Sequence, residues 1–198
     1  MPSPARSNRP LVVIAAFTGS LIVGLLVVLW SVGALQGVQP SSIGGAFQMT
    51  SQSGQPVSEQ SIKGKPTLIF FGFTRCPDVC PTTLFELSQV LAAMGKDADR
   101  INAYFVSVDP ERDTPASMKD YLSSFDPHVV GLTGTPEQTQ QIEKAYRVYA
   151  RKVPLKDGDY TMDHTALVYL MDKSGRFVSP FDVKRKPEEA AADLKRYL

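Results

Sequence analysis

The chain has 198 residues, of which 43% are hydrophobic and 21% are charged, and its 21 basic and 20 acidic side chains nearly cancel. A nucleic-acid binder of the sequence-independent kind needs a basic face that neutralises phosphates, so a formal net charge of +1 argues against that class. Two cysteines are too few for a disulfide scaffold and two histidines are too few for a His-rich metal site, so any metal chemistry must use few soft ligands.

The first part of the chain predicts a membrane anchor. Residues 11–35 contain no charged side chain and are rich in Leu, Val and Ile, and about 20 such residues cross the hydrocarbon core of a bilayer. Arg6 and Arg9 precede this segment, and no further Lys or Arg occurs before Lys63. The positive-inside rule therefore places residues 1–10 in the cytoplasm. We expect a single-pass protein of a bacterial inner (cytoplasmic) membrane, with its soluble domain on the periplasmic side.

The alternative to this anchor is a signal peptide cleaved near Ala34. The apolar core of a signal peptide usually has about 7–15 residues, which is shorter than the run found here, so we favour an uncleaved span. Residues 36–45 are small and polar, with several glycines and serines, and predict a flexible tether. Residues 46–198 then form the soluble domain.

Predicted strands alternate with predicted helices in the soluble domain. The strands are short apolar runs, and the helices begin at prolines and repeat apolar residues at intervals of three and four. In chain order these elements are a hairpin of residues 46–50 and 55–57, a strand at 67–73, a helix from Pro81 to Met94, a strand at 101–108, a helix from Pro115 to Phe125, a strand at 128–132, a helix from Pro136 with Ile142, Tyr146 and Tyr149 facing inward, strands at 165–171 and 176–178, and a helix from Pro187.

This alternation indicates βαβ crossovers and a mostly parallel central sheet. An N-terminal β-hairpin, together with a helix directly after the first buried strand, predicts an α/β fold of the thioredoxin-like sandwich type. One transmembrane helix would precede it.

Cys76 and Cys80 lie between the first buried strand and the helix that follows it, where α/β proteins commonly place their sites. Helix N-termini favour anions, so these thiols should be more acidic than that of a free cysteine. Two sulfurs four residues apart can hold one metal ion or form one disulfide. A purely structural disulfide would close a very short loop and restrain little of the unfolded chain.

His164 directly precedes the strand predicted at 165–171. Thioredoxin-like oxidoreductases have a cis-proline at the corresponding place, packed against their cysteines, whereas this chain has His164 and no proline there. One imidazole beside two thiolates is a donor set that suits Cu(I), and Cu(II) and Zn(II) can also use it. The other histidine, His128, has no such context, and we interpret it as structural.

Four segments of the sequence resemble the Sco/SenC family of membrane-tethered copper proteins. They are FFGFTRCPDVCPTTL at 70–84, VSVDPERDTP at 106–115, VGLTG at 130–134 and DHTALVYLMDKSG at 163–175. The combination of CPxxCP with a downstream Asp-His before a strand is specific, whereas neither half alone would be. The likeness extends from about residue 44 to residue 198.

The resemblance implies that Cys76, Cys80 and His164 bind copper, as Cu(I) or Cu(II). It places Asp78 and Asp163 beside these ligands, where they would tune the thiolate and the imidazole. The family helps to assemble the dinuclear copper centre of cytochrome c oxidase, by delivering copper or by reducing the cysteines of the target.

The implied function is that of a metallochaperone rather than an enzyme, with cytochrome c oxidase subunit II as its partner. Another periplasmic copper carrier or a thioredoxin-like reductase is a further expected partner, and a nucleic acid is not. The alternative is a thiol–disulfide oxidoreductase that cycles Cys76 and Cys80 in extracytoplasmic redox homeostasis, which the C-x₃-C spacing disfavours. A peroxidase is disfavoured as well, because Thr74 lies two residues before Cys76 and peroxiredoxins place their threonine three before.

Overall fold

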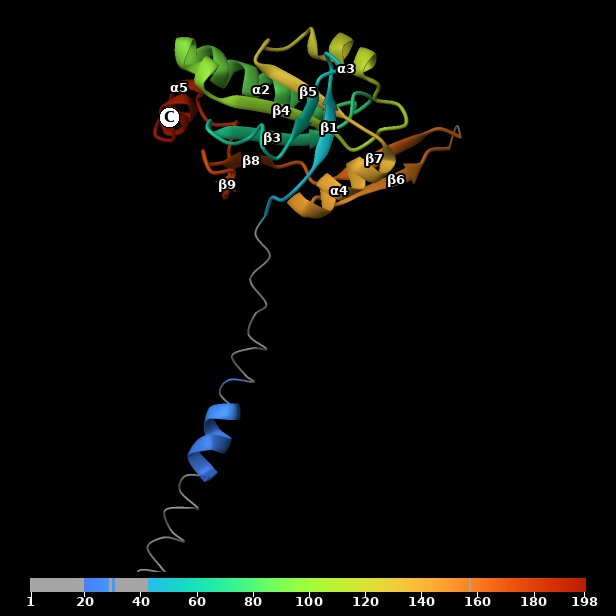
Figure 1. Ribbon diagram of the computed structural model, residues 1–198. Helices are drawn as coiled ribbons and strands as arrows, with labels where there is room; N and C mark the ends of the chain where they lie inside the picture. The colour runs from blue at the N-terminus through green and yellow to red at the C-terminus, as the bar shows by residue number, and fades with distance from the viewer. Residues whose placement is uncertain (1–19, 29, 31–42, 157) are drawn as a thin grey trace, which may run out of the picture. The chain divides into compact units, whose positions relative to one another are not determined.

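Strands and helices alternate along most of the computed structural model, which describes residues 20–28, 30, 43–156 and 158–198 (Figure 1). The chain divides into two compact units, Met1–Ser41 and Ser42–Leu198. In the first unit, residues 20–28 are helical. None of the helices in the described part of the chain is long and apolar enough to span a membrane. The end expected at 1–10 lies outside the described residues, as do most of the span expected at 11–35 and most of the tether at 36–45.

The second unit contains all of the labelled strands and helices. In chain order they are β1 (Gln48–Ser51), β2 (Pro56–Ser58), β3 (Thr67–Gly72), α2 (Val79–Met94), a 3₁₀-helix (Gly95–Arg100), β4 (Asn102–Ser107), α3 (Pro115–Leu122), β5 (Val129–Thr133), α4 (Pro136–Tyr146), β6 (Ala150–Pro154), β7 (Tyr160–His164), β8 (Val168–Met171), β9 (Phe177–Pro180) and α5 (Pro187–Lys195).

The described strands form a mixed seven-stranded sheet, in the order β2-β1-β5-β4-β3-β8-β9, and a separate ribbon of β6 and β7. Neighbours β3, β4 and β5 run parallel, and the remaining neighbours in the large sheet pair antiparallel. The expected thioredoxin-like α/β sandwich is thus present, but the expectation of a mostly parallel sheet holds only for these three central strands. Short turns join β1 to β2 and β8 to β9, and only antiparallel strands can be joined that way.

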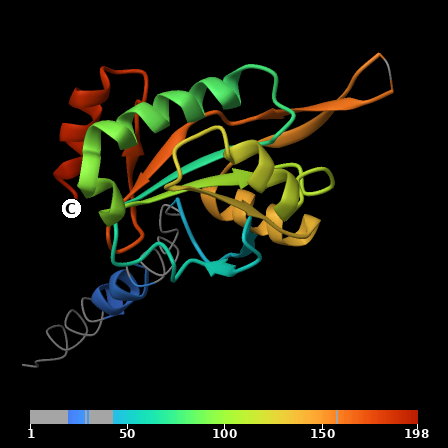
Figure 2. The same cartoon turned by 90° about the horizontal axis from the view of Figure 1, so that it is seen from above.

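The central strands are buried because helices cover both faces of the sheet. Every residue of β3 is buried, as its continuous apolar run predicts. Phe70 packs on Phe105, with ring centroids 5.8 Å apart, on the side of the sheet where α3 supplies Tyr121. Phe71 points to the other side and meets Tyr146 of α4 at 5.6 Å. Helices α2 and α5 pack against each other (Figure 2).

Three of the predicted helix ends need correction. Helix α3 ends at Leu122 rather than at Phe125. Helix α2 begins at Val79 rather than at Pro81, so Cys80 is its second residue. Proline is tolerated anywhere in the first turn of a helix, because the N–H groups there have no partner within the helix. A proline in the sequence therefore locates the first residue of a helix only to within about one turn. Helix α4 ends at Tyr146, where Arg147 adopts a left-handed conformation with φ 55°. Tyr149, expected to face inward, lies beyond this end and is 51% exposed.

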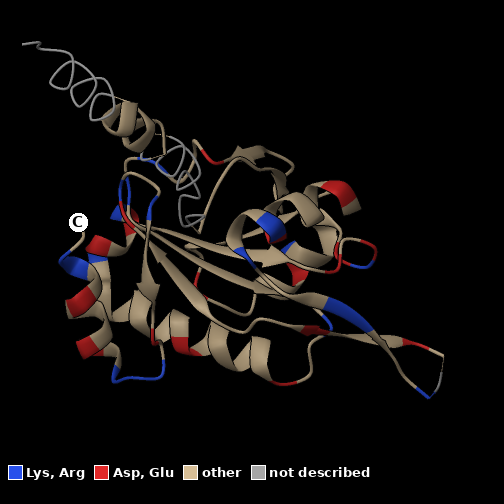
Figure 3. Ribbon diagram, turned by 90° about the horizontal axis from the view of Figure 1, so that it is seen from below, with Lys and Arg blue, Asp and Glu red and all other residues tan. Residues whose placement is uncertain are grey.

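The ribbon of β6 and β7 was not predicted. The strand expected at 165–171 begins only at Val168, and His164 instead ends β7, opposite Ala150 of β6. Figures 1 and 2 show the ribbon extending away from the large sheet, and Figure 3 shows that it has both basic and acidic residues. The ribbon places His164 beside the segment that contains the two cysteines.

Candidate metal centre

Strand β3 and helix α2 bring Cys76 and Cys80 together. Cys76 lies in the short segment after β3, and the backbone N–H of Cys80, in the first turn of α2, donates a hydrogen bond to Cys76 Sγ at 3.3 Å. Both cysteines are free thiols, and Cys76 is 8% exposed while Cys80 is fully buried. Gly72 allows this close packing, because a Cβ at that position would lie 2.7 Å from Cys80 Sγ.

His164 approaches the cysteines from the end of β7. Its Nε2 lies 3.6 Å from Cys80 Sγ, and its Nδ1 lies 3.1 Å from the backbone carbonyl oxygen of Thr165. A carbonyl oxygen can only accept a hydrogen bond, so Nδ1 is the protonated nitrogen and Nε2 presents its lone pair to the sulfur. The edge-to-face contact with Phe73, at a centroid distance of 5.7 Å, helps to fix the ring.

The three side chains form a compact donor set. Cys76 Sγ, Cys80 Sγ and a ring nitrogen of His164 all lie within 4.8 Å of one another, and no other such group of Cys, His, Asp or Glu occurs in the described part of the chain. A hollow of about 270 Å³ borders Cys76 and His164 and opens to solvent. Two soft sulfurs and one imidazole fit Cu(I), which accepts low coordination numbers.

The two thiols have opposite acidities. The hydrogen bond that the Cys80 thiol donates to Cys76, together with those from the backbone of Asp78 and Cys80, lowers the pKa of Cys76 to about 4. The same interaction and burial raise the pKa of Cys80 above its ordinary value. Without a metal the pair therefore consists of one thiolate, on Cys76, and one thiol, on Cys80.

Asp78 and Asp163 both border the hollow. Asp78 is the N-cap residue of α2, but its side chain makes no capping hydrogen bond, and its backbone N–H contributes to the low pKa of Cys76. Asp163 is exposed, and its carboxylate lies 4.0 Å from Arg151 on the neighbouring strand. Their expected influence on the ligands stays a prediction.

Sequence reasoning missed a buried carboxylate behind the cysteines. Asp113 is 1% exposed and accepts hydrogen bonds from Thr74 Oγ1 at 2.6 Å, from Thr74 N at 3.1 Å and from Ser107 Oγ at 2.6 Å. Burial raises the pKa of Asp113. These bonds fix the segment that leads from β3 to Cys76. Its only signal in the sequence is its place in the VSVDPERDTP motif.

His128 takes no part in this group. Its Nδ1 lies 2.7 Å from Asp126 Oδ1 and its Nε2 lies 3.1 Å from Asp99 Oδ1. The hydrogen bond to Asp126, followed by the one to Asp99, raises the pKa of His128. These contacts agree with the interpretation of His128 as a structural residue.

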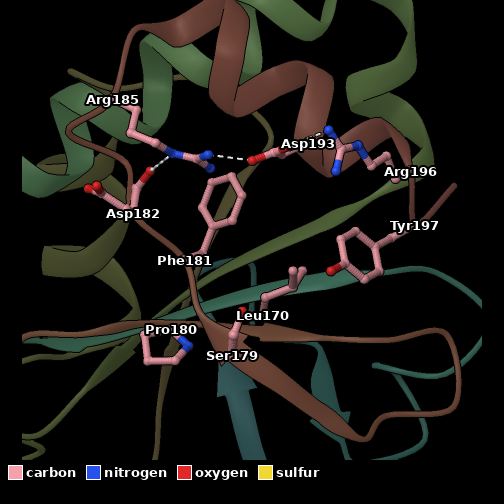
Figure 4. Close-up of a pocket in the computed structure, with 9 residues that line it drawn as sticks. All are labelled: Leu170, Ser179, Pro180, Phe181, Asp182, Arg185, Asp193, Arg196 and Tyr197. Atoms are coloured by element: carbon pink, nitrogen blue, oxygen red, sulfur yellow. Dashed lines mark hydrogen bonds and ion pairs between the residues drawn. The ribbon is translucent and has the colours of Figure 1, made fainter.

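A larger hollow of about 350 Å³ lies next to α5, away from the cysteines (Figure 4). Arg185 and Arg196 border it, and both pair with Asp193, the latter at 3.0 Å. Arg185 also donates to the backbone oxygen of Asp182 at 3.3 Å. Both arginines are therefore already ion-paired, and no Cys or His lines this hollow. The hollow that borders Cys76 and His164 is the candidate site.

Comparisons with known proteins identify a family for this chain. Residues 36–198 match the family model described as SCO1/SenC. A structure of Bradyrhizobium japonicum ScoI with copper bound is 72% identical, with a TM-score of 0.78, and the match covers 79% of this chain and 100% of that one. Arabidopsis thaliana ScoI with copper bound is 34% identical, with a TM-score of 0.71 and coverage of 79% and 98%.

Among curated proteins, the human mitochondrial SCO1 homologue is 38% identical over 159 residues, which are 79% of this chain and 53% of the human protein. The SCO2-like protein of Rickettsia conorii is 36% identical over 155 residues, which are 77% of this chain and 76% of that protein. The family model spans most of the chain, and several relatives exceed 30% identity. The chain therefore belongs to the SCO1/SenC family.

Proposed function

We propose that this protein is a copper metallochaperone. Cys76, Cys80 and His164 bind copper as cargo, and the protein delivers it to the dinuclear copper centre of cytochrome c oxidase subunit II, or prepares the cysteines of that centre. The observation that carries the proposal is the convergence of the three donor atoms within 4.8 Å of one another. Copper-bound structures of relatives from B. japonicum and A. thaliana support the choice of metal.

The chemistry of transfer follows from how the donors are placed. The low pKa of Cys76 keeps one sulfur deprotonated, so a copper ion can be captured first by this thiolate. Cys80 must then lose its proton and His164 offers its lone pair, which completes an S₂N set. The hollow beside Cys76 and His164 gives the ligands of a partner access to the ion. Asp78 and Asp163, at the edges of that hollow, tune the charge there.

The proposed location is a membrane surface outside the cytoplasm. Residues 11–35 would be a single membrane span that follows a cytoplasmic end at 1–10, and residues 36–45 would tether the domain at 46–198. The charge asymmetry around the apolar run supports this orientation. A tether of this kind raises the effective concentration of the domain near a partner in the same membrane, so a weak and transient contact suffices for transfer.

The second candidate is a thiol–disulfide oxidoreductase, and the acidity of Cys76 favours it. A thiolate with a pKa of about 4, 8% exposed, can attack a disulfide of a partner, and the buried Cys80 can then resolve the mixed disulfide. His164 argues against this as the main activity, because a dithiol reductase has no need for an imidazole lone pair at 3.6 Å from the second sulfur.

The test compares copper binding by the reduced and the oxidised full chain in detergent. Copper binding and a Cys76–Cys80 disulfide use the same sulfurs, so the oxidised protein should take up little Cu(I) until it is reduced. Affinity would be measured anaerobically by competition with a chromophoric Cu(I) chelator. Equal uptake by both forms would overturn the proposed site.

A second measurement separates the two candidate functions. Copper-loaded protein would be mixed with reduced, copper-free subunit II, and copper-free reduced protein with subunit II whose two metal-centre cysteines form a disulfide. The metallochaperone proposal expects copper to move in the first mixture. Thiol exchange in the second mixture without any transfer in the first would favour the oxidoreductase.

A further inference from the structure

The ribbon that holds His164 is not stabilised by the large sheet. Strands β6 and β7 pair only with each other among the described strands. An isolated two-stranded ribbon is marginally stable in water, so contacts with the rest of the domain must keep it in place. The position of His164 therefore depends on contacts that hold β7 other than its hydrogen bonds to β6.

One such point lies at the opposite end of β7 from His164. The hydroxyl of Tyr160 donates a hydrogen bond to Asp109 Oδ1 at 2.8 Å, and Arg112 Nη1 donates to the carbonyl oxygen of Tyr160 at 2.8 Å. The Arg112 guanidinium also stacks on the Tyr160 ring, at 3.7 Å from its centroid, and pairs with Asp109. We name these three residues the Tyr160 clamp. Asp109 is 1% exposed, so the clamp reaches into the interior.

Tyr160 of the clamp and His164 lie on the same face of β7. Side chains of a strand alternate between its two faces, so Tyr160, Met162 and His164 share one of them. Tyr160 contacts the loop after β4, Met162 packs on the core, and His164 meets Cys80 and Phe73. A tilt of β7 that broke the first contact would therefore also displace the third.

The loop after β4 contacts both halves of the site. Asp113, near its end, accepts the hydrogen bonds of Thr74 and so holds the segment before Cys76. Asp109 and Arg112, earlier in the same loop, hold Tyr160. One short segment thus fixes both the strand that ends in the imidazole and the segment that leads to the sulfurs.

We infer that Arg112 and Tyr160 are positioning residues for the metal centre, which hold β7 so that His164 Nε2 stays at the two sulfurs. The inference rests on the proposed function, because it assigns His164 as a copper ligand. Neither residue is one of the three donors, and neither borders the hollow beside them. Their effect on copper binding therefore passes entirely through the position of His164.

The test uses two conservative substitutions. Arg112→Lys keeps the positive charge but loses the planar guanidinium that stacks on Tyr160 and bonds its carbonyl. Tyr160→Phe keeps the ring and removes only the hydroxyl bond to Asp109. We expect the Cu(I) affinity to fall in Arg112→Lys by no more than the loss of about tenfold or more in His164→Ala, because the clamp acts through that imidazole. The loss in Tyr160→Phe should be smaller still.

The decisive comparison repeats Arg112→Lys in the presence of His164→Ala. If the clamp acts through the imidazole, the substitution should have no further effect once the imidazole is gone. An equal loss of affinity with and without His164→Ala would indicate general damage and overturn the inference. Arg176→Lys is the matched control, because Arg176 pairs with Asp172 beside β8 and not with the ribbon, and its copper affinity should equal that of the wild type.

Hydrogen exchange of the copper-free protein gives an answer that does not depend on copper. Amides of β7 should exchange faster in Arg112→Lys than in the wild type, while those of β3 stay protected. Unchanged exchange in β7 would overturn the clamp. If His164→Ala lowers copper affinity and Arg112→Lys does not, the clamp is wrong and the proposed function stands. If the wild type binds no copper, the proposed function is wrong, and the exchange of β7 decides whether the clamp exists.

Discussion

The two sulfurs and the imidazole of the site come from regions that are held in different ways. Cys76 and Cys80 follow β3, whose residues are all buried, and Cys80 lies in the first turn of α2, which packs in the core. His164 ends a ribbon whose residues are exposed or half-buried at every described position of β6 and β7. We call Cys76 and Cys80 the sulfur half of the site and His164 the imidazole half. The sulfur half belongs to the buried core of the domain, whereas the imidazole half is held against that core by side-chain contacts.

This difference suits a protein that must both hold an ion and give it up. A donor on the core cannot move without disturbing the packing around it, because interiors are close-packed. A donor on a ribbon fixed by a few polar contacts can move at lower cost. We therefore expect copper to remain on the two sulfurs while His164 is the first ligand to be exchanged for one from the partner.

Breaking the sulfur half should have the largest effect. Cys80→Ser replaces a soft sulfur with a hard oxygen that Cu(I) binds poorly, and Cys76→Ser does the same at the other position. Each substitution should abolish tight Cu(I) binding in an anaerobic competition titration. Serine is close to cysteine in size, so circular dichroism should show an unchanged fold. A variant that still competes for Cu(I) as the wild type does would remove that sulfur from the site.

Breaking the imidazole half should have a smaller and metal-dependent effect. His164→Ala leaves two sulfurs that can hold Cu(I) in a linear arrangement, so the Cu(I) affinity should fall by about tenfold or more without vanishing. Cu(II) prefers more ligands and nitrogen donors, so its binding should suffer more, and both can be titrated anaerobically. His128→Ala is the matched control and should bind both ions normally. Normal binding of both ions by His164→Ala would favour the oxidoreductase.

The same two regions differ in how far the sequence predicts them. The run at 67–73 and the prolines Pro115 and Pro136 are local signals, and the structure confirms them as β3 and as the first residues of α3 and α4. The placement of Cys76 and Cys80 between strand and helix follows from the same kind of local pattern. The ribbon lacks such a pattern, because charged residues such as Arg151 and Lys152 occupy successive positions of β6.

The supporting contacts of the site could not be predicted for a different reason. Thr74 and Asp113 are 39 residues apart, and Asp109 and Tyr160 are 51 residues apart. No periodicity in a sequence reports a hydrogen bond over such a separation. His164 was identified by its place directly before a predicted strand and by the family motif, and the residues that hold it in place had no comparable signal.

Crowding the sulfur half from behind should reduce stability and copper binding together. In Gly72→Ala the new Cβ would lie 2.6 Å from Phe105 Cε2 and 2.7 Å from Cys80 Sγ, so one of these groups must shift. Overpacking of this kind lowers the free energy of unfolding by about 1–3 kcal/mol, which urea denaturation would measure. Gly45→Ala is the control, because its Cβ would meet only Ala145 at an ordinary 3.4 Å. Equal stability of the two variants would contradict the close approach.

The smallest effect concerns α4, which leads into the ribbon but supplies no donor. Burial raises the pKa of Glu143 from 4.5 to about 7. The folded state therefore binds this proton more tightly than the unfolded state, so stability is highest below pH 4.5, falls as the pH rises toward 7 and is constant above that. The glutamine of Glu143→Gln cannot ionise, so this variant should not show the fall in stability between pH 4.5 and 7. Because Glu143 is only half-buried, the gain of the variant near pH 8 should be about 1 kcal/mol or less.

Urea denaturation of both proteins near pH 5 and near pH 8 measures this difference. Glu137→Gln, on the same helix, is the control, because hydrogen bonds from Thr135 and the backbone lower the pKa of Glu137. Its removal should leave the fall in stability between pH 4.5 and 7 in place. The same slope in Glu143→Gln as in the wild type would show that Glu143 ionises normally in the folded protein. Copper affinity should be unchanged in both variants, because α4 contributes neither a sulfur nor a residue of the Tyr160 clamp. A loss of copper affinity in Glu143→Gln would mean that the end of α4, which leads into β6, also positions His164.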